Sequence, residues 1–263
     1  MMEQPVTADQ PPSPGSGGQK PLSFMDKAAG VFYEPSRVFE SLKTAGVKFV
    51  DWFVPVLLLA LLTSVATYVR LSSPDLRFQV VQQQEAAIDK MVTEGKMTAD
   101  QAQQAKTTME DRFQSGSVSV IGIGVFTTFV AVWIIFFIIS GIWLLVGKYA
   151  LKGTMTYTHA MGIVGLSEWI ALVGVIIGTV MSVMLSRLDG GLQLGMLTQM
   201  NTQNKTYQLL SRVDLFTLWS LVVVSIGLAK IAGKKVSQSA IWVFGIWVLW
   251  SILSIFVLGG MLG

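Results

Sequence analysis

The stretch VSVIGIGVFTTFVAVWIIFFIISGIWLLV, residues 118–146, decides the class of this chain. It carries no charged residue and is longer than the roughly 20 apolar residues that cross a bilayer as a helix. Hydrocarbon offers the backbone no hydrogen-bond partner, so a helix is the expected form of such a run. Outward from it, similar runs occupy about residues 53–69, 161–185, 215–229 and 240–262. The sequence therefore predicts an all-α integral membrane protein with five transmembrane helices in a membrane domain at 51–263.

The composition supports this class and excludes others. Of 263 residues, 52% are hydrophobic and only 13% are charged, whereas soluble domains carry about 25% charged residues. The small net charge of +3 gives no support for nucleic-acid binding. The chain has no cysteine, so disulfides, thiolate catalysis and cysteine-ligated metals are excluded.

Basic residues indicate which ends of the spans face the cytoplasm, because cytoplasmic connections are enriched in Lys and Arg. The bases before the first span and in the short second-to-third and fourth-to-fifth connections are Lys20, Lys27, Arg37, Lys43, Lys48, Lys148, Lys152, Lys230, Lys234 and Lys235. The connection at 73–117 weakly opposes this assignment, since it also holds bases, but it is long and its acidic residues outnumber them. We therefore expect a multi-pass protein of the cell (inner) membrane with a cytoplasmic N-terminus and an extracytoplasmic C-terminus.

Two segments precede the first span. Residues 1–20, with the run PPSPGSGG, are expected to form a disordered tail, because they hold too little apolar surface to offset the entropy of ordering. Residues 21–50 predict two amphipathic helices on the cytoplasmic membrane surface. Their interfacial residues are Phe24, Phe32, Pro35, Val38, Phe39 and Leu42, and Pro35 begins the second helix. A plain polar linker is the alternative.

The long connection at 73–117 predicts an extramembrane helical hairpin between the first two spans. Pro74 can start its first helix, Gly95 can end it, and Thr98 can cap the second. Each helix has an apolar stripe, and the candidate partner-docking residues on the stripes are Val80, Ile88, Met91, Met109 and Phe113. The hairpin is either a docking arm for a partner, or a pair of helices whose stripes cover each other or pack on the outer ends of the spans.

Side chains suited to chemistry are few. Glu168, in GLSEWIALVG, is the intramembrane polar candidate, since a carboxylate inside an apolar run is costly and often functional. It could relay protons or bind a cation, but Trp169 beside it suits a position near the membrane interface, where a packing role suffices. His159 is the only histidine and lacks companion ligands at helical spacing. We expect no catalytic residue, no cofactor and no metal, and interpret the chain as a non-enzyme.

Small residues line one face of the third span, where they permit close helix approach. They are Gly162, Gly165, Gly174, Gly178 and Ser182. Helix packing within the chain is the simpler explanation of this face. Formation of a homo-oligomer, or contact with another membrane protein, is the alternative.

Three stretches resemble the Yip family, the Ypt/Rab-interacting-protein domain. They are MDKAAGVFYEPSRVFESLK at 25–43, DWFVPVLLLALL at 51–62 and AKIAGKKVSQSAIWVF at 229–244. The resemblance covers about residues 23–263 and implies five spans with a cytoplasmic N-terminus, although the insert at 73–117 departs from the family pattern. Eukaryotic members are described as Rab-GTPase and vesicle-traffic partners, whereas some bacterial members resemble accessory subunits of ABC-type exporters. The bacterial type is the closer resemblance.

Three functions are compatible with these observations. The favoured hypothesis is a non-catalytic scaffold or accessory subunit that binds another membrane complex, with an ABC-type exporter as the partner implied by the resemblance. A small-solute or proton-coupled transporter using Glu168 is an alternative, although the sequence shows no internal repeat of the transporter kind. A membrane-shaping or trafficking factor, which wedges residues 21–50 into one leaflet, is the other.

Overall fold

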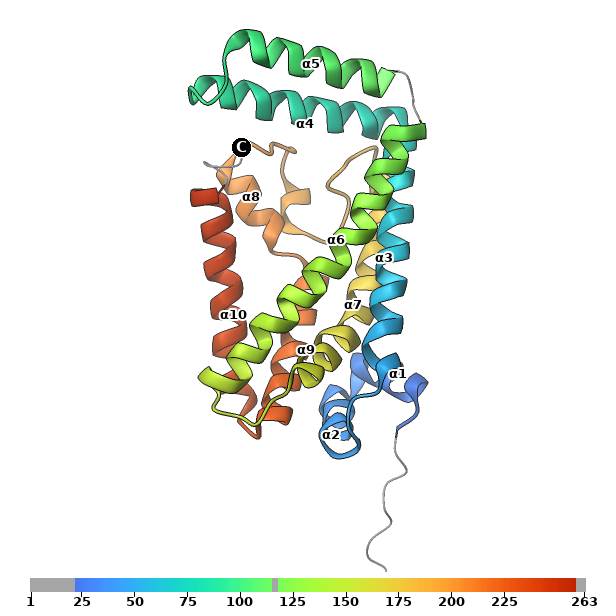
Figure 1. Cartoon of the computed structure of the whole chain (residues 1–263), viewed down its shortest axis with the longest axis vertical. Helices are drawn as coiled ribbons and strands as arrows, with labels where there is room; N and C mark the ends of the chain where they lie inside the picture. The colour runs from blue at the N-terminus through green and yellow to red at the C-terminus, as the bar shows by residue number, and fades with distance from the viewer. Residues whose placement is uncertain (1–21, 115–117, 259–263) are drawn as a thin grey trace, which may run out of the picture.

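The computed structural model describes residues 22–114 and 118–258, so the predicted tail at 1–20 lies outside the described residues. The described residues are almost entirely helical (Figure 1), and the only strand-like pairing among them is an isolated bridge between Gln193 and Asp214. This architecture confirms the predicted all-α class.

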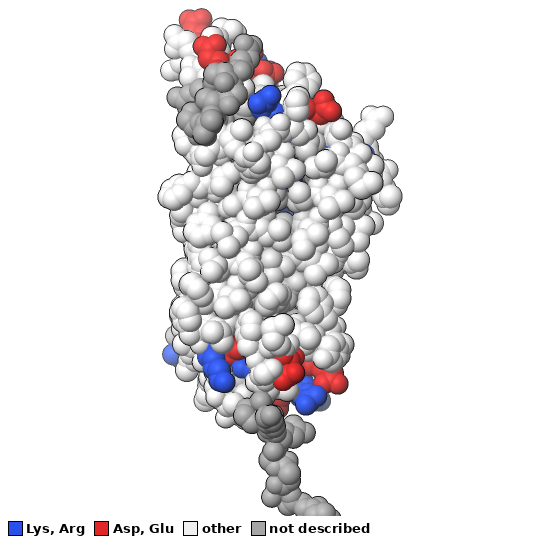
Figure 2. All heavy atoms as spheres, turned by 90° about the vertical axis from the view of Figure 1, so that its right-hand side faces the viewer, with Lys and Arg blue, Asp and Glu red and all other residues white. Residues whose placement is uncertain are grey.

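Five long apolar helices form the body of the protein and confirm the five predicted spans. They are α3 (Phe49–Ser72), α6 (Val118–Leu145), α7 (Tyr157–Met184), α9 (Leu215–Ala232) and α10 (Val236–Leu253). A π-helical turn, η1 (Val146–Ala150), continues α6, and another, η3 (Ser254–Leu258), continues α10. Figure 2 shows a wide uncharged band between two ends that carry Lys, Arg, Asp and Glu, as expected for a bilayer-spanning bundle.

The helix α7 is the centre of the bundle and packs against α3, α6 and α9. Its side chains Ile163, Leu166 and Ile170 are fully buried. Within the most apolar stretch of α7, 56% is buried inside the protein. The corresponding share is 22% for α6 and 22% for α10. The helices α6 and α10 are therefore the two spans that leave most of their surface to the surroundings.

Two short helices lie under one end of the bundle, α1 (Phe24–Tyr33) and α2 (Pro35–Ala45). Ser23 caps α1, because its hydroxyl accepts from the Asp26 N–H and the Asp26 carboxylate accepts from the Ser23 N–H. Pro35 occupies the first turn of α2, where its missing N–H removes no helical hydrogen bond. Both helices follow from local sequence signals.

The opposite end carries the hairpin of α4 (Pro74–Thr93) and α5 (Ala99–Gln114), which lies across the spans in Figure 1. Gly95 permits the turn between the two helices with φ +70°, a left-handed conformation that favours glycine. Thr98 and Gln101 cap α5 reciprocally, as the sequence predicts. Beneath the hairpin, a loop after α7 contains the short helices η2 (Leu194–Leu197) and α8 (Lys205–Arg212).

Candidate functional site

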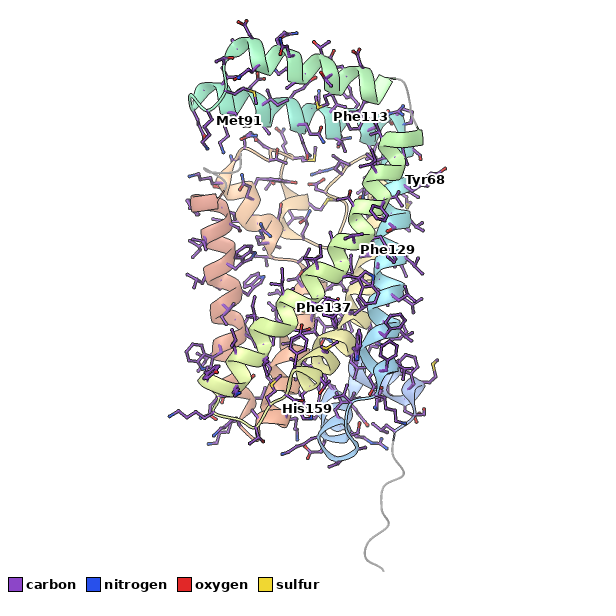
Figure 3. All side chains as sticks on the ribbon, viewed as in Figure 1. Tyr68, Met91, Phe113, Phe129, Phe137 and His159 are labelled. Atoms are coloured by element: carbon purple, nitrogen blue, oxygen red, sulfur yellow. The ribbon has the colours of Figure 1, made fainter. Side chains whose placement is uncertain are left out.

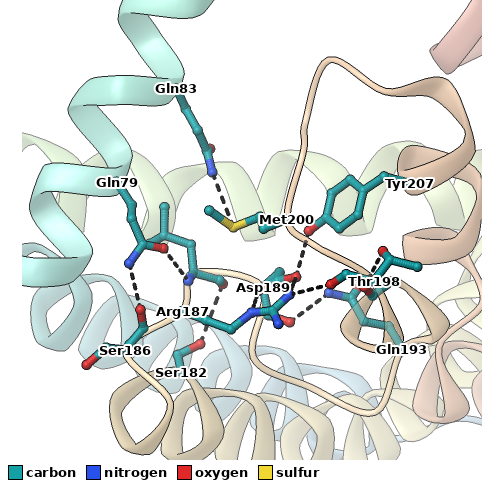
Figure 4. Close-up of polar contacts among 12 residues, drawn as sticks. Gln79, Gln83, Ser182, Ser186, Arg187, Asp189, Gln193, Thr198, Met200 and Tyr207 are labelled. Atoms are coloured by element: carbon teal, nitrogen blue, oxygen red, sulfur yellow. Dashed lines mark hydrogen bonds and ion pairs between the residues drawn. The ribbon is translucent and has the colours of Figure 1, made fainter.

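The hairpin is attached to the membrane domain along one face of α4. Both polar atoms of the Gln79 amide bind the backbone of the loop after α7 (Figure 4). Nε2 donates to the Ser186 carbonyl at 2.6 Å, and Oε1 accepts from the Leu188 N–H at 3.2 Å. One turn earlier Leu76 is fully buried, and one turn later Gln83 reaches the Met200 sulfur at 3.9 Å. These contacts hold α4 against the end of the spans opposite α1 and α2.

The loop that Gln79 binds is organised by hydrogen bonds to the Asp189 carboxylate (Figure 4). Arg187 donates to both oxygens of Asp189, from Nε at 2.9 Å and from Nη2 at 2.8 Å, and the Tyr207 hydroxyl donates at 2.7 Å. Burial raises the pKa of Asp189, but the hydrogen bonds from Arg187 and Tyr207 outweigh it and leave that pKa below its ordinary value. Burial, with the hydrogen bond to Asp189, raises the pKa of Tyr207 to about 12. The cluster thus stays paired at neutral pH and stiffens the surface on which the hairpin rests.

The predicted docking residues of the hairpin are half-buried rather than free. They are Val80, Ile88, Met91, Met109 and Phe113, and Figure 3 shows Met91 and Phe113 towards opposite ends of the hairpin. Met109 and Phe113 line a groove of about 850 Å³ between α5 and the N-terminal end of α6, with Met97 and Ile123 beside them. Flexible thioether and aromatic side chains suit a surface that adapts to another protein. The groove leaves room for a further protein segment beside α5.

A second cleft, of about 590 Å³, extends between α6, α7 and α9 towards the loop after α7. Glu168 lies in its lining among apolar side chains such as Trp143 and Val164. In the described part of the chain the Glu168 carboxylate makes no hydrogen bond or ion pair. Arg70 also lines the cleft, and its buried Nε has no hydrogen-bond partner among the described residues. The cleft therefore holds unpaired groups of opposite sign.

Other parts of the same chain pack against the small residues of α7. A Cβ on Gly165 would collide with the Trp52 Cα in α3, and one on Gly174 would come within 3.0 Å of Phe216 in α9. Gly162 and Gly178 are similarly tight, and the Ser182 hydroxyl donates to the Leu188 carbonyl at 3.5 Å. This face lets α3, α9 and the loop after α7 approach α7 closely.

The apolar positions of the N-terminal helices face the bundle. Val38, Phe39 and Leu42 are almost completely buried, and Phe39 packs against Gly227 of α9. Phe24 and Phe32 are half-buried and place their rings 6.1 Å from Trp169 and 5.6 Å from Trp219. The sequence predicts these residues on the apolar faces of two interfacial helices, and in the structure those faces pack against α7 and α9.

A buried ion pair at this end was not singled out by sequence reasoning. Lys27 Nζ lies 2.7 Å from Asp51 Oδ2, and the two side chains are 3% and 0% exposed. The same Asp51 oxygen accepts from the Lys48 N–H at 2.9 Å at the start of α3, while Oδ1 has no partner among the described residues. The pair joins α1 to the first span. A lysine in an amphipathic segment and an aspartate before an apolar run were the only available signals.

His159 has a local role at the start of α7. Its Nδ1 accepts from the Thr156 N–H at 3.3 Å, and the Thr156 hydroxyl accepts from the His159 N–H at 3.3 Å. Within residues 22–114 and 118–258, no three His, Cys, Asp or Glu side chains lie close enough to hold a metal ion. The arrangement of His159 is that of a helix cap.

Of the comparisons with known proteins, the one with protein-family models agrees with this architecture. No curated protein and no solved structure matches the chain significantly. A family model described as the Yip1 domain matches residues 29–258, from within α1 to the end of η3. That match covers most of the chain and all five long apolar helices. The chain therefore belongs to the Yip family of multi-pass membrane proteins.

Proposed function

We propose that this protein is a non-catalytic membrane scaffold or accessory subunit that binds another integral membrane complex. The observation that carries the proposal is the groove beside α5, which continues onto the exposed face of α6. Ile123 lines the groove and is 66% exposed, and Phe126 one turn along is 68% exposed. A partner with a transmembrane helix beside α6 and an extramembrane segment in the groove would cover both surfaces.

The way in which the hairpin is attached supports this proposal. The Gln79 contacts and buried Leu76 hold α4 on the bundle, so the groove keeps a defined position relative to α6. A surface held in its binding geometry loses less conformational entropy when a partner binds. The bundle covers the apolar face of α1 and α2, so this face is not available to a partner. The proposed interface therefore consists of the hairpin and the spans.

We further propose an ABC-type exporter as the partner, a bacterial inner membrane as the location, and a cytoplasmic N-terminus. The exporter follows from the resemblance to bacterial accessory subunits. The orientation follows from the bases in the N-terminal segment and the two short connections, because the positive-inside rule places such regions in the cytoplasm. The hairpin and its groove then face the extracytoplasmic side.

Site-specific photo-crosslinking in native membranes tests the interface. A photo-reactive residue replaces Ile123 in the groove, and a matched control replaces Leu249, which is 65% exposed on α10. We expect Ile123 to give one discrete adduct whose mass and peptides identify a subunit of an exporter, and Leu249 to give lipid adducts only. Equal protein adducts at both positions, or none at Ile123, would contradict the proposed face.

A proton-coupled transporter is the second candidate, and the cleft that holds Glu168 and Arg70 favours it. An unpaired carboxylate inside a span is a group that could carry a proton or bind a cation. Proteoliposomes with an internal pH dye test this function. Proton flux that Glu168→Gln abolishes, and that survives replacement of the groove residue Phe113 by Glu, would favour transport over the scaffold.

A further inference from the structure

A third pocket lies at the end of the bundle that carries α1 and α2, between the turn after α6 and the start of α10. Its volume is about 330 Å³. Its lining consists of Ala150, Leu151, Lys152, Lys234, Gln238, Ile241 and Trp242. Segments far apart in the sequence thus bring two ammonium groups to one pocket, and none of the lining residues is a carboxylate.

The two lysines are free to meet a ligand. Lys152 and Lys234 are exposed, and in the described part of the chain neither enters an ion pair. The nearby Lys230, by contrast, lies 3.8 Å from the Glu40 carboxylate. The pocket therefore keeps its positive charge uncompensated by the protein.

The backbone at Lys152 is held in an uncommon conformation. Its φ is +51°, in the left-handed region that side chains other than glycine rarely adopt. The turn is fixed on both sides, because the Gly153 N–H donates to the Gly147 carbonyl at 2.9 Å and a Cβ on Gly153 would lie 2.8 Å from the Ala232 Cα. Strained residues persist where the surroundings enforce them, and they are concentrated at binding sites. The enforced turn aims Lys152 at the pocket instead of leaving it on a flexible loop.

The other half of the lining is apolar and continues along the membrane-facing side of α10. Ile241 is 72% exposed and Trp242 is 47% exposed, about one turn into the span. Tryptophan at this depth is typical of the headgroup level of a bilayer. The N-terminus of α10 also lies here, where the helix dipole favours an anion.

We propose that this pocket binds the headgroup phosphate of an anionic phospholipid, with the acyl chains lying along Ile241 and Trp242. The ammonium groups of Lys152 and Lys234 neutralise the phosphate from two sides, and Gln238 can donate a hydrogen bond to it. A free phosphate shares the polar part of this chemistry, but it leaves the apolar part of the lining unused. The site is independent of the partner proposed above.

Native mass spectrometry of the purified full chain, released from nanodiscs, tests the site. The nanodiscs contain phosphatidylglycerol and phosphatidylcholine in equal amounts, and inorganic phosphate is added in a parallel series. We expect phosphatidylglycerol to be retained on the wild type, and the double variant Lys152→Gln/Lys234→Gln to lose about tenfold in that retention. Gln238→Glu, which places a carboxylate in the pocket and leaves both lysines, is expected to weaken retention as well.

Lys48→Gln is the matched control, because Lys48 is exposed just before α3 at the same end of the protein and does not line the pocket. An equal loss in Lys48→Gln would overturn the site in favour of general attraction between bases and lipid. Displacement of the lipid by inorganic phosphate would show a phosphate site and overturn the lipid assignment. Equal retention of the two lipids by the wild type would overturn the proposal altogether.

Discussion

The ion pair between Lys27 and Asp51 gives the sharpest prediction about the N-terminal helices. Lys27→Met keeps the length of the side chain but leaves the Asp51 carboxylate, which is 0% exposed, with only the Lys48 N–H as a partner. Removing one member of a buried pair typically costs about 3–5 kcal/mol, because the remaining charge stays desolvated. The equilibrium between docked and undocked α1 should therefore shift by about two to four orders of magnitude.

The absence of cysteine allows a direct assay of this docking equilibrium. A cysteine that replaces Ala28, which is 7% exposed in α1, should react with a maleimide only when α1 leaves the bundle. We expect much faster labelling in the Lys27→Met background. The double variant Lys27→Met/Asp51→Asn should recover a large part of the protection, because neither replacement side chain is charged and the introduced amide carbonyl can still accept from the Lys48 N–H at the start of α3.

Lys43→Met is the control for the loss of a lysine at the same end, since Lys43 is exposed. It should leave the labelling rate of the Ala28→Cys reporter unchanged. If Lys27→Met labels no faster than Lys43→Met, the pair does not hold α1 on the bundle. If the double variant is as unprotected as Lys27→Met alone, the cost comes from lost packing of the lysine side chain and the electrostatic reasoning is refuted.

Three further predictions concern the rest of the fold. Gln79→Ala removes the two hydrogen bonds that the Gln79 side chain makes with the loop after α7. It should destabilise hairpin docking by about 1–2 kcal/mol and speed hydrogen exchange in α4 without affecting the five spans. Tyr207→Phe removes the hydrogen bond to Asp189. It should destabilise the folded loop after α7 by about 1.5–3 kcal/mol, measured as faster hydrogen exchange in that loop. Because the folded pKa of Asp189 is lowered, its contribution is fully present at neutral pH and should disappear as the pH falls through that lowered value, so acid should reproduce the effect. Gly165→Ala should cost about 1–3 kcal/mol by pressing on α3, whereas Gly141→Ala, with open space around its Cβ, should leave the melting temperature equal or higher.

The overall architecture was predictable because its signals are local. A long uncharged run predicts a span wherever it occurs, and capping residues such as Ser23 and Thr98 act on the helix that follows them. The hairpin could be read from Pro74 and Gly95 for the same reason. None of these inferences requires knowledge of which helices meet.

The contacts that organise the candidate site could not be predicted, because they join residues that are distant in the sequence. Lys27 meets Asp51, Gln79 meets the loop at Ser186, and nothing in the intervening residues specifies either encounter. Hydropathy also cannot say whether an amphipathic helix turns its apolar face to lipid or to protein. For α2 the sequence predicts an interfacial helix, and only the packed bundle shows that its apolar side chains are buried against α7 and α9.

Native mass spectrometry of the tagged protein, extracted gently from its native membrane, shows whether the chain is a subunit of a larger membrane complex. We expect one assembly of fixed stoichiometry that contains the subunits of an exporter, and that is lost when Phe113 in the groove is replaced by Glu. A chain that appears alone, or only with copies of itself, would contradict the proposed role as an accessory subunit.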